Sequence, residues 1–225
     1  MIRRMTALAA TFLVLGSMSR ADAALSIASI VGGVPTGVNY VNFNDLTLGA
    51  GGGTSGGIAV TFTGTAQAVQ GSSSGLYAAP FLSNSNGALF GDPTVAGADA
   101  TTYLSTGTGT VSLALPGTQM YLGLLWGSVD SYNTLQFFSG NNLVGTLTGA
   151  DVAIAANGDQ GASGTYYVNI NSTLGFDRVV ASSSSNAFEF DNVAFNPNAV
   201  PEPASLALMG SGLIGLVLAR RRMAR

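Results

Sequence analysis

The sequence predicts an all-β domain, an antiparallel β-sandwich of the jelly-roll kind. Between the two chain ends, short runs of Val, Ile, Leu, Phe and Tyr have the length of single strands and are bounded by Gly or Asn. No stretch between the ends carries an amphipathic pattern long enough for a helix. Glycine is abundant, with 31 copies in 225 residues, and supplies the turns that many short strands need.

Each run of β-forming residues is one expected strand. In chain order, the expected strands cover residues 40–44, 58–64, 66–70, 110–115, 120–126, 134–138, 142–148, 165–170, 176–181 and 187–195. Residues 49–57 form a glycine-rich loop that lacks the lysine and the following helix of a phosphate-binding loop. Residues 71–99 form a long excursion with few strand signals, which is typical of either a functional or a mobile loop.

The last expected strand sorts its side chains by face. Phe188 and Phe190 fall on one face and Glu189 and Asp191 on the other, because successive side chains of a strand alternate. The apolar register then shifts, which indicates a bulge around Asn192.

Two further expectations concern neighbours of this strand. Arg178 lies one expected strand away and is the natural partner for Glu189 or Asp191. The segment FNDL at 43–46 resembles FDNV at 190–193, so we expect the first strand to lie beside or near the last.

The expected domain, residues 24–199, is strongly acidic. Its single basic side chain is Arg178, and nine acids against this one base give a net charge of −8: Asp45, Asp92, Asp99, Asp130, Asp151, Asp159, Asp177, Glu189 and Asp191. A surface of this sign repels phosphates, so no nucleic acid is expected as a partner. The chain has no His and no Cys, which excludes Ser-His-Asp and Cys-His catalysis, ordinary zinc sites and iron–sulfur clusters.

Residues 1–23 have the pattern of a secretory signal peptide. Arg3 and Arg4 form a positive start, residues 7–15 form an apolar core, and Ala21-Asp22-Ala23 is a small-x-small cleavage site. The pattern predicts export and removal of a signal helix by signal peptidase.

Residues 200–225 form a tail with three parts in fixed order. Pro201 and Pro203 prevent a helix from running back into the domain. Residues 204–219 carry no charge and would span about 24 Å as a helix, and terminal arginines could extend it toward a ~30 Å hydrocarbon core. The arginines, which hold this end in the cytoplasm by the positive-inside rule, are Arg220, Arg221, Arg222 and Arg225. The tail predicts a transmembrane helix with a basic anchor.

This order of triplet, apolar helix and arginine run resembles the PEP-CTERM sorting tail of bacterial surface proteins. Its sorting motif is Val200, Pro201, Glu202 and Pro203. The resemblance implies that an exosortase, a membrane-embedded protease-transpeptidase, cuts near the triplet. The inner-membrane anchor would then be transient, and the protein would reach the cell surface or the extracellular matrix. The alternative is an ordinary single-span anchor or a buried hydrophobic helix.

The interior resembles a family of exosortase-dependent surface proteins of unknown function. The segments that carry this resemblance are YVNFNDL, GLLWGSVDSYNTL, GDQGASGTYYVNIN and FDRVVASSSSNAFEFDNVAF. The opening FNDL and closing FDNV also look like the first and last strands of galactose-binding-like jelly rolls. These resemblances imply a destination and a fold, and they imply no reaction.

A loop between two expected strands is the candidate ligand site. It places Trp126, Asp130, Tyr132 and Asn133 within eight residues. Carbohydrate-binding modules use this mixture of aromatic faces for sugar rings and polar groups for hydroxyls. The alternative is structural, with Trp126 in the core and the polar residues capping a turn.

Three acids are candidate ligands of a structural calcium ion, namely Asp45, Glu189 and Asp191. Calcium accepts carboxylates, amides and carbonyls, and it needs neither His nor Cys. Such a site would close the first strand onto the last. In the alternative the acids are dispersed, with one paired to Arg178. Apart from this ion, we expect the protein to require no cofactor.

These observations favour an exported, exosortase-processed surface or exopolysaccharide-matrix protein without catalytic activity. The alternative is a lectin-like module that binds carbohydrate through the 126–133 loop. A glycosidase would use Glu189 and Asp191, about 6–7 Å apart, but neighbours on one face of one strand cannot flank a sugar from opposite sides. Ice binding through threonine runs is a remote option, with either Thr61, Thr63 and Thr65 or Thr106, Thr108 and Thr110.

Overall fold

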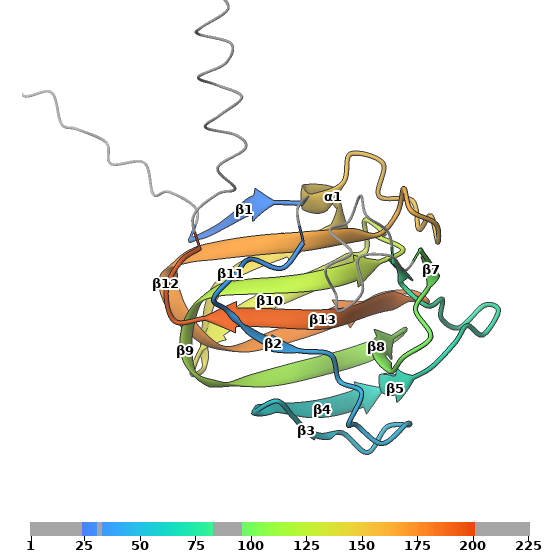
Figure 1. Ribbon diagram of the computed structural model, residues 1–225, viewed down its shortest axis with the longest axis horizontal. Coiled ribbons are helices and arrows are strands. Elements are labelled where there is room, and N and C mark those ends of the chain that lie inside the picture. The colour runs from blue at the N-terminus through green and yellow to red at the C-terminus, as the bar shows by residue number, and fades with distance from the viewer. Residues whose placement is uncertain (1–23, 31–32, 83–95, 201–225) are drawn as a thin grey trace, which may run out of the picture.

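The structure, a computed structural model, describes residues 24–30, 33–82 and 96–200. These residues form an eleven-stranded sheet and a separate two-stranded one, with every strand pair antiparallel (Figure 1). The predicted all-β, antiparallel class is confirmed. The predicted signal helix and transmembrane helix lie outside the described residues, and in the described part no helix is long and apolar enough to cross a membrane.

The elements follow one another along the chain as short strands around two long ones. They are β1 (Leu25–Ser29), β2 (Asn39–Val41), β3 (Gly53–Ser55), β4 (Ile58–Gly64), β5 (Gln67–Val69), β6 (Phe81–Leu82), β7 (Gly97–Ala98), β8 (Tyr103–Thr106), β9 (Gly109–Gly127), β10 (Asn133–Ser139), β11 (Asn142–Thr148), α1 (Gly149–Val152), β12 (Tyr166–Ser183) and β13 (Phe188–Asn196).

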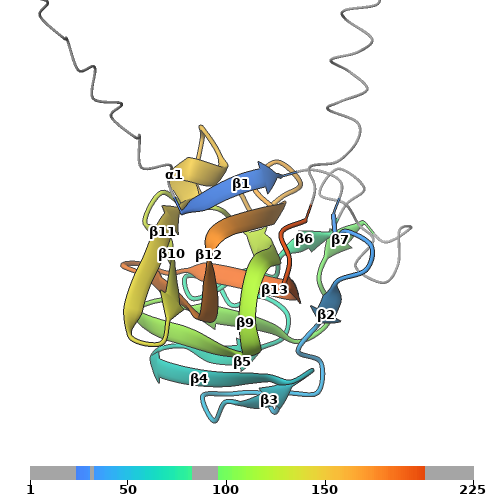
Figure 2. The ribbon, with the colours of Figure 1, turned by 90° about the vertical axis from the view of Figure 1, so that its left-hand side faces the viewer.

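The long strands β9 and β12 belong to both halves of the sheet. The first half of β9 pairs with β4 and with the second half of β12, which in turn pairs with β10. The second half of β9 pairs with β13 and with the first half of β12, which also pairs with β1. The sheet therefore has two parts joined through the β9–β12 pair, with β1 at one edge and the β3–β4 pair at another (Figures 1 and 2).

The prediction of two separate strands within each of these elements was wrong. Residues 110–115 and 120–126 are one strand, as are residues 165–170 and 176–181. Pro116 and Gly117 are residues typical of turns, and Gly117 has a φ of +88°, yet here the two form a corner within β9. The register of β12 against β9 shifts between Asn171 and Phe176, which lies opposite this corner.

Two expectations about β13 are confirmed: the strand that lies beside it and the bulge within it. β2, which corresponds to the first strand expected from the sequence, pairs with β13 through Val41 and Val193, whereas the unexpected β1 precedes it and pairs with β12. The register against β9 shifts between Asp191 and Ala194, and Asn192 has a φ of +55°, as expected for a bulge.

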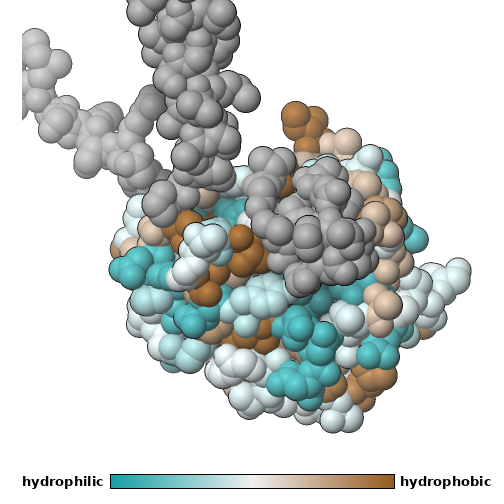
Figure 3. Space-filling view, viewed as in Figure 1, coloured by the Kyte–Doolittle hydropathy of each residue, from teal (hydrophilic) through white to brown (hydrophobic). Residues whose placement is uncertain are grey.

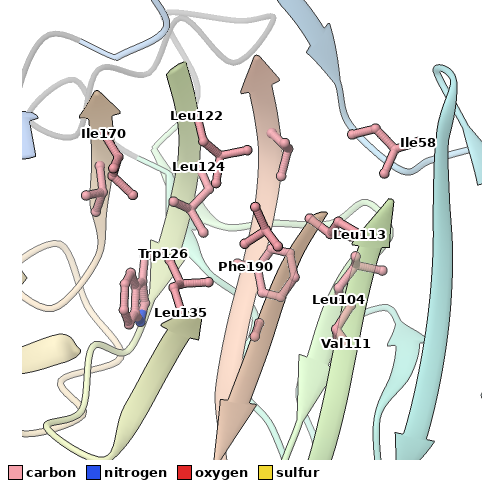
Figure 4. Close-up of a cluster of buried hydrophobic side chains, with 14 of the residues drawn as sticks. Ile58, Leu104, Val111, Leu113, Leu122, Leu124, Trp126, Leu135, Ile170 and Phe190 are labelled. Carbon is pink, nitrogen blue, oxygen red and sulfur yellow. The ribbon is translucent and has the colours of Figure 1, made fainter. Parts of the chain in front are cut away.

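The core lies between the inward faces of the two halves of the sheet. Buried side chains from β4, β8, β9, β10, β12 and β13 meet there, and Figure 4 shows part of this cluster, including Ile58, Leu113, Leu124, Ile170 and Phe190. Burial of this apolar surface is the main stabilising term for a domain without disulfides.

Residues 71–82 and Asp99 cover the outer side of β13 and its neighbours. The amide of Ala78 donates to Glu189 of β13 at 2.8 Å, and that of Phe81 donates to the Thr165 hydroxyl at 3.2 Å. The amide of Asp99 donates to the carbonyl of Pro80 at 2.8 Å. The described parts of the long excursion therefore pack on the sheet. As a result β13 is buried on both faces, and its acids are buried with it.

Hydrophilic and hydrophobic side chains are interspersed over the face shown in Figure 3. The large exposed apolar residues are scattered over different elements: Tyr40, Leu48, Leu76, Leu143, Ile154 and Leu174. Isolated exposures of this kind are normal for a soluble domain.

Candidate functional site

A polar cleft of about 480 Å³ opens at the end of the molecule where β13 begins. Its walls come from residues 72–78, the turn after β9, and residues 157–160, and Asn186, Ala187 and Glu189 complete it. Its polar lining consists of serine, asparagine and glutamine side chains with the carboxyl groups of Asp130 and Glu189, and Tyr77 and Tyr132 are its aromatic residues. The cleft therefore offers hydrogen bonds and two rings, which suits an uncharged polar ligand.

Glu189 contributes a carboxyl group to the cleft from the outward face of β13. Its Oε1 accepts the amide of Ala78 at 2.8 Å, and its Oε2 accepts the hydroxyl of Ser128 at 2.5 Å. Burial raises the pKa of Glu189 to about 7, although the bonds from Ser128 and Ala78 oppose the shift, and the charge of Asp130 adds to it. Both protonation states are therefore populated near neutral pH.

Asp130 and Tyr132 lie in the turn between β9 and β10. The Asp130 backbone forms a β-bridge with Asn157, and a Cβ at Gly158 would lie 2.8 Å from both carboxylate oxygens of Asp130, so Gly158 leaves room for that carboxylate. The Tyr132 hydroxyl donates to the carbonyl of Asn186 at 3.3 Å. Burial, followed by hydrogen bonding with Asp130 and its charge, raises the pKa of Tyr132 to about 12, so the phenol is neutral.

The other two residues of the predicted ligand loop do not line the cleft. Trp126 is fully buried and stacks on Phe188, with ring centroids 4.4 Å apart. Asn133 is also fully buried. It accepts hydrogen bonds from the Trp126 ring N–H and from the amide of Asp130, and it donates to the Ala187 carbonyl. The structural interpretation therefore holds for Trp126 and Asn133, whereas Asp130 and Tyr132 reach the candidate site.

Asp191 lies two residues beyond Glu189 but outside the cleft. Its side chain is fully buried, and burial followed by the charge of Asp99 raises the pKa of Asp191 well above its ordinary value. Asp99 accepts the amide and hydroxyl of Thr101 at 2.8 and 2.6 Å. Among the described residues, both carboxylate oxygens of Asp191 are buried without a hydrogen-bond partner, which is why burial favours its neutral form. Glu189 and Asp191 do not share a cleft in which they could act as a glycosidase pair.

The three predicted calcium ligands have different surroundings. Glu189 lines the cleft, Asp191 lies beside Asp99, and Asp45 accepts the hydroxyl of Ser55. Across residues 24–30, 33–82 and 96–200, no group of three or more His, Cys, Asp or Glu side chains is placed to hold a metal ion. The structure does not bring the predicted ligand set together.

Arg178 does not pair with the acids of β13, contrary to the expectation. Its guanidinium donates to the carbonyl of Gly140 at 3.3 Å and lies 4.1 Å from the centre of the Phe138 ring. The reason is register, because Arg178 lies between Phe138 of β10 and Ala114 of β9, and this half of β9 pairs on its other side with β4 and not with β13.

The two threonine runs lie against each other, but only the first is exposed throughout. Thr61, Thr63 and Thr65 are exposed on or next to β4, and the Thr63 hydroxyl bonds that of Thr110 at 2.8 Å. Thr106 is fully buried, so the second run cannot present its threonines together.

Several cleft residues were not predicted from the sequence. Tyr77 lies in the expected excursion at 71–99, Asn157 and Gln160 lie between the expected strands at 142–148 and 165–170, and Glu189 was assigned to a metal site instead. Their local sequence contains no signal for the cleft, because four distant parts of the chain form it. The GDQG turn, which carries Gly158 and Gln160, is the nearest to such a signal.

Comparison with known proteins identifies the tail. Residues 199–222 match the PEP-CTERM protein-sorting motif, which implies an exported, cell-surface protein that an exosortase processes from a transient membrane anchor. Of this match, only Ala199 and Val200 fall within the described residues. No curated protein and no solved structure matches the chain. The resemblance of the interior to a surface-protein family therefore stays a prediction.

Proposed function

We propose that the mature protein is a surface or exopolysaccharide-matrix protein without catalytic activity, delivered by its sorting tail. The sorting motif at 199–222 is the observation that carries this proposal. The predicted signal peptide supports it, because both ends then carry segments for export and processing. The domain itself, which we interpret as a jelly-roll-like sandwich, supplies a stable body that is displayed after processing.

The proposal is tested by making the protein in two strains, the first with the exosortase and the second without it. Intact mass of the surface-associated protein should show the loss of residues 1–23 and of the arginine run at 220–225 in the first strain. A dominant surface species that retains the arginines in the presence of exosortase would overturn it.

A second candidate function is carbohydrate binding by the polar cleft, and the lining of the cleft favours it. Tyr77 and Tyr132 offer ring faces, and Asp130, Asn157 and Gln160 offer groups that bond to hydroxyls. The domain has one basic side chain against its acids, so a neutral glycan suits its surface better than a polyanionic one.

Binding should fail when the exposed polar groups of the cleft are removed. We expect Gln160→Ala to weaken binding of a neutral glycan about five- to tenfold, as the loss of one good hydrogen bond would. The matched control is Asn142→Ala, an exposed polar residue of β11 outside the cleft. A glycan array with the processed protein identifies the ligand, and equal binding by both variants would exclude the cleft.

A further inference from the structure

The folded domain ends directly at the sorting motif, with no free linker between them. β13 ends at Asn196, and the motif match begins at Ala199. Asn196 itself is held, because its side chain donates to the carbonyl of Gly37 at 3.1 Å and accepts the amide of Asn198 at 2.8 Å.

The Asn171 side chain binds the residue that precedes the triplet. Its Nδ2 donates to the carbonyl of Val200 at 2.7 Å, and its Oδ1 accepts the amide of Val200 at 2.9 Å. The amide of one side chain thus satisfies both backbone groups of Val200, as a neighbouring strand would. The Val200 side chain also packs against the cluster of Tyr121, Leu125, Tyr167 and Ala194.

Asn171 lies in the corner of β12 that also holds the start of the domain. The amide of the nearby Thr173 donates to the carbonyl of Ala24 at 2.8 Å, and Leu25 pairs with Ser172. Residues 171–173 therefore hold both boundaries of the domain.

We propose that Asn171 is a positioning residue that limits processing of the tail. A protease must seat the peptide on both sides of the bond that it cuts, and the backbone of Val200 is held on the domain by Asn171 until it is released. Breaking two hydrogen bonds at Val200 is the opening step, and Asn171 sets its equilibrium. This proposal rests on exosortase processing of the tail, and it adds the step that controls its rate.

The test measures how fast the full-length precursor disappears in cells with and without exosortase. We expect Asn171→Ala to speed processing about five- to thirtyfold, because two hydrogen bonds of roughly 0.5–1 kcal/mol each oppose opening. Asn142→Ala is the matched control and should process like the wild type, since Asn142 is exposed on β11 and takes no part in the hydrogen bonds at Val200.

A flexible Gly-Ser insertion between Val200 and Pro201, ending in a new Val so that a Val-Pro-Glu-Pro motif is kept, separates this role from simple destabilisation. The insertion supplies an extended peptide without opening the clamp, so it should speed processing as much as Asn171→Ala does. In the insertion background, Asn171→Ala should add nothing. A further acceleration there would show that the variant acts by loosening the whole domain, and it would overturn the proposal.

The outcomes also separate this proposal from the proposed function. Equal or slower processing of Asn171→Ala, with processing still dependent on exosortase, overturns the role of Asn171 and leaves the sorting function intact. Identical precursor lifetimes of the wild type with and without exosortase overturn both.

Discussion

Glu189 shows how the fold changes the chemistry of a single carboxyl group. It occupies an outward position on β13, where the alternation of side chains predicts contact with water, yet only 1% of its surface is exposed. Residues 72–78 cover it, and Ala78 and Ser128 replace water as its hydrogen-bond donors. The result is an acid that titrates near pH 7 beside the candidate site.

The raised pKa of Glu189 makes stability depend on pH. The folded state binds its proton up to about pH 7, whereas the unfolded state loses it near pH 4.5. Stability is therefore full below pH 4.5 and falls as the pH rises through 7, by at most about 3 kcal/mol from this group. Asp191 acts in the same direction. Urea unfolding should give a lower free energy of unfolding at pH 8 than at pH 5.

Glu189→Gln should reduce this pH dependence. Glutamine keeps an acceptor for the Ala78 amide and mimics the neutral acid, so the variant should gain most at pH 8. Asp159→Asn, in an exposed turn, removes one negative charge without changing a buried group. It should leave the dependence of the unfolding free energy on pH unchanged. If Glu189→Gln retains the full pH slope, Glu189 is not its source.

Asn133, unlike Glu189, stabilises the core, because its buried side chain satisfies the hydrogen bonds of buried neighbours. Asn133→Ala would leave the Trp126 ring N–H, the Asp130 amide and the Ala187 carbonyl without their present partner. At roughly 1–3 kcal/mol for each buried group left unsatisfied, we expect a loss of about 3 kcal/mol or more. Chemical denaturation checks this, with Asn142→Ala as the near-neutral control. A loss under 1 kcal/mol would contradict the structural role.

The candidate site was predictable only in part, for a reason visible in these residues. Trp126, Asp130, Tyr132 and Asn133 are neighbours in sequence, so composition could group them, but burial alone decides that two face the cleft and two face the core. Glu189 joins the cleft because Ala78, 111 residues away, folds over it. No local pattern encodes that contact.

At the scale of elements, the alternation of side chains and the turn residues predicted most strands. They failed for very short strands and for long strands that contain a corner. The alternation in 58–64, 134–138 and 142–148 identified β4, β10 and β11 closely. β8 was missed, because four residues among glycines and threonines carry little signal. The corners of β9 and β12 contain turn residues although pairing continues on both sides, and this depends on tertiary packing that the local sequence does not contain.

The segment that covers β13 packs closely on the second half of β9, and Gly127 is the point of contact. A Cβ at Gly127 would lie 3.1 Å from the Cα and side-chain atoms of Pro80. Gly127→Val should therefore push residues 78–81 away from the sheet and expose Glu189. We expect faster proteolysis within residues 71–82, with the circular dichroism of the sheet retained. Gly51→Val, where a Cβ has open space, is the control. Equal proteolysis of the two variants would contradict the packing role.

At the scale of the whole molecule, the cleft and the chain boundaries lie at opposite ends. β13 begins beside the cleft at Phe188 and ends at Asn196, close to the corner that holds Ala24 and Val200. Nine residues of strand separate the ends by roughly 30 Å. β1 starts and β13 ends on the left of Figure 1, at the end away from the cleft. A precursor held by its tail would therefore present the cleft away from the membrane.

This orientation can be measured, because the chain has no cysteine of its own. Leu76, on the rim of the cleft, and Leu174, in the corner beside Asn171, are 54% and 57% exposed, so each can carry a single cysteine of matched accessibility. With a bulky polyethylene glycol maleimide, Leu76→Cys should react several times faster than Leu174→Cys in the membrane-held precursor, since the bilayer shields only the tail end. In the processed, released protein the two rates should become equal. If the two cysteines react at the same rate in the precursor, or if Leu174→Cys reacts faster, the cleft does not point away from the membrane.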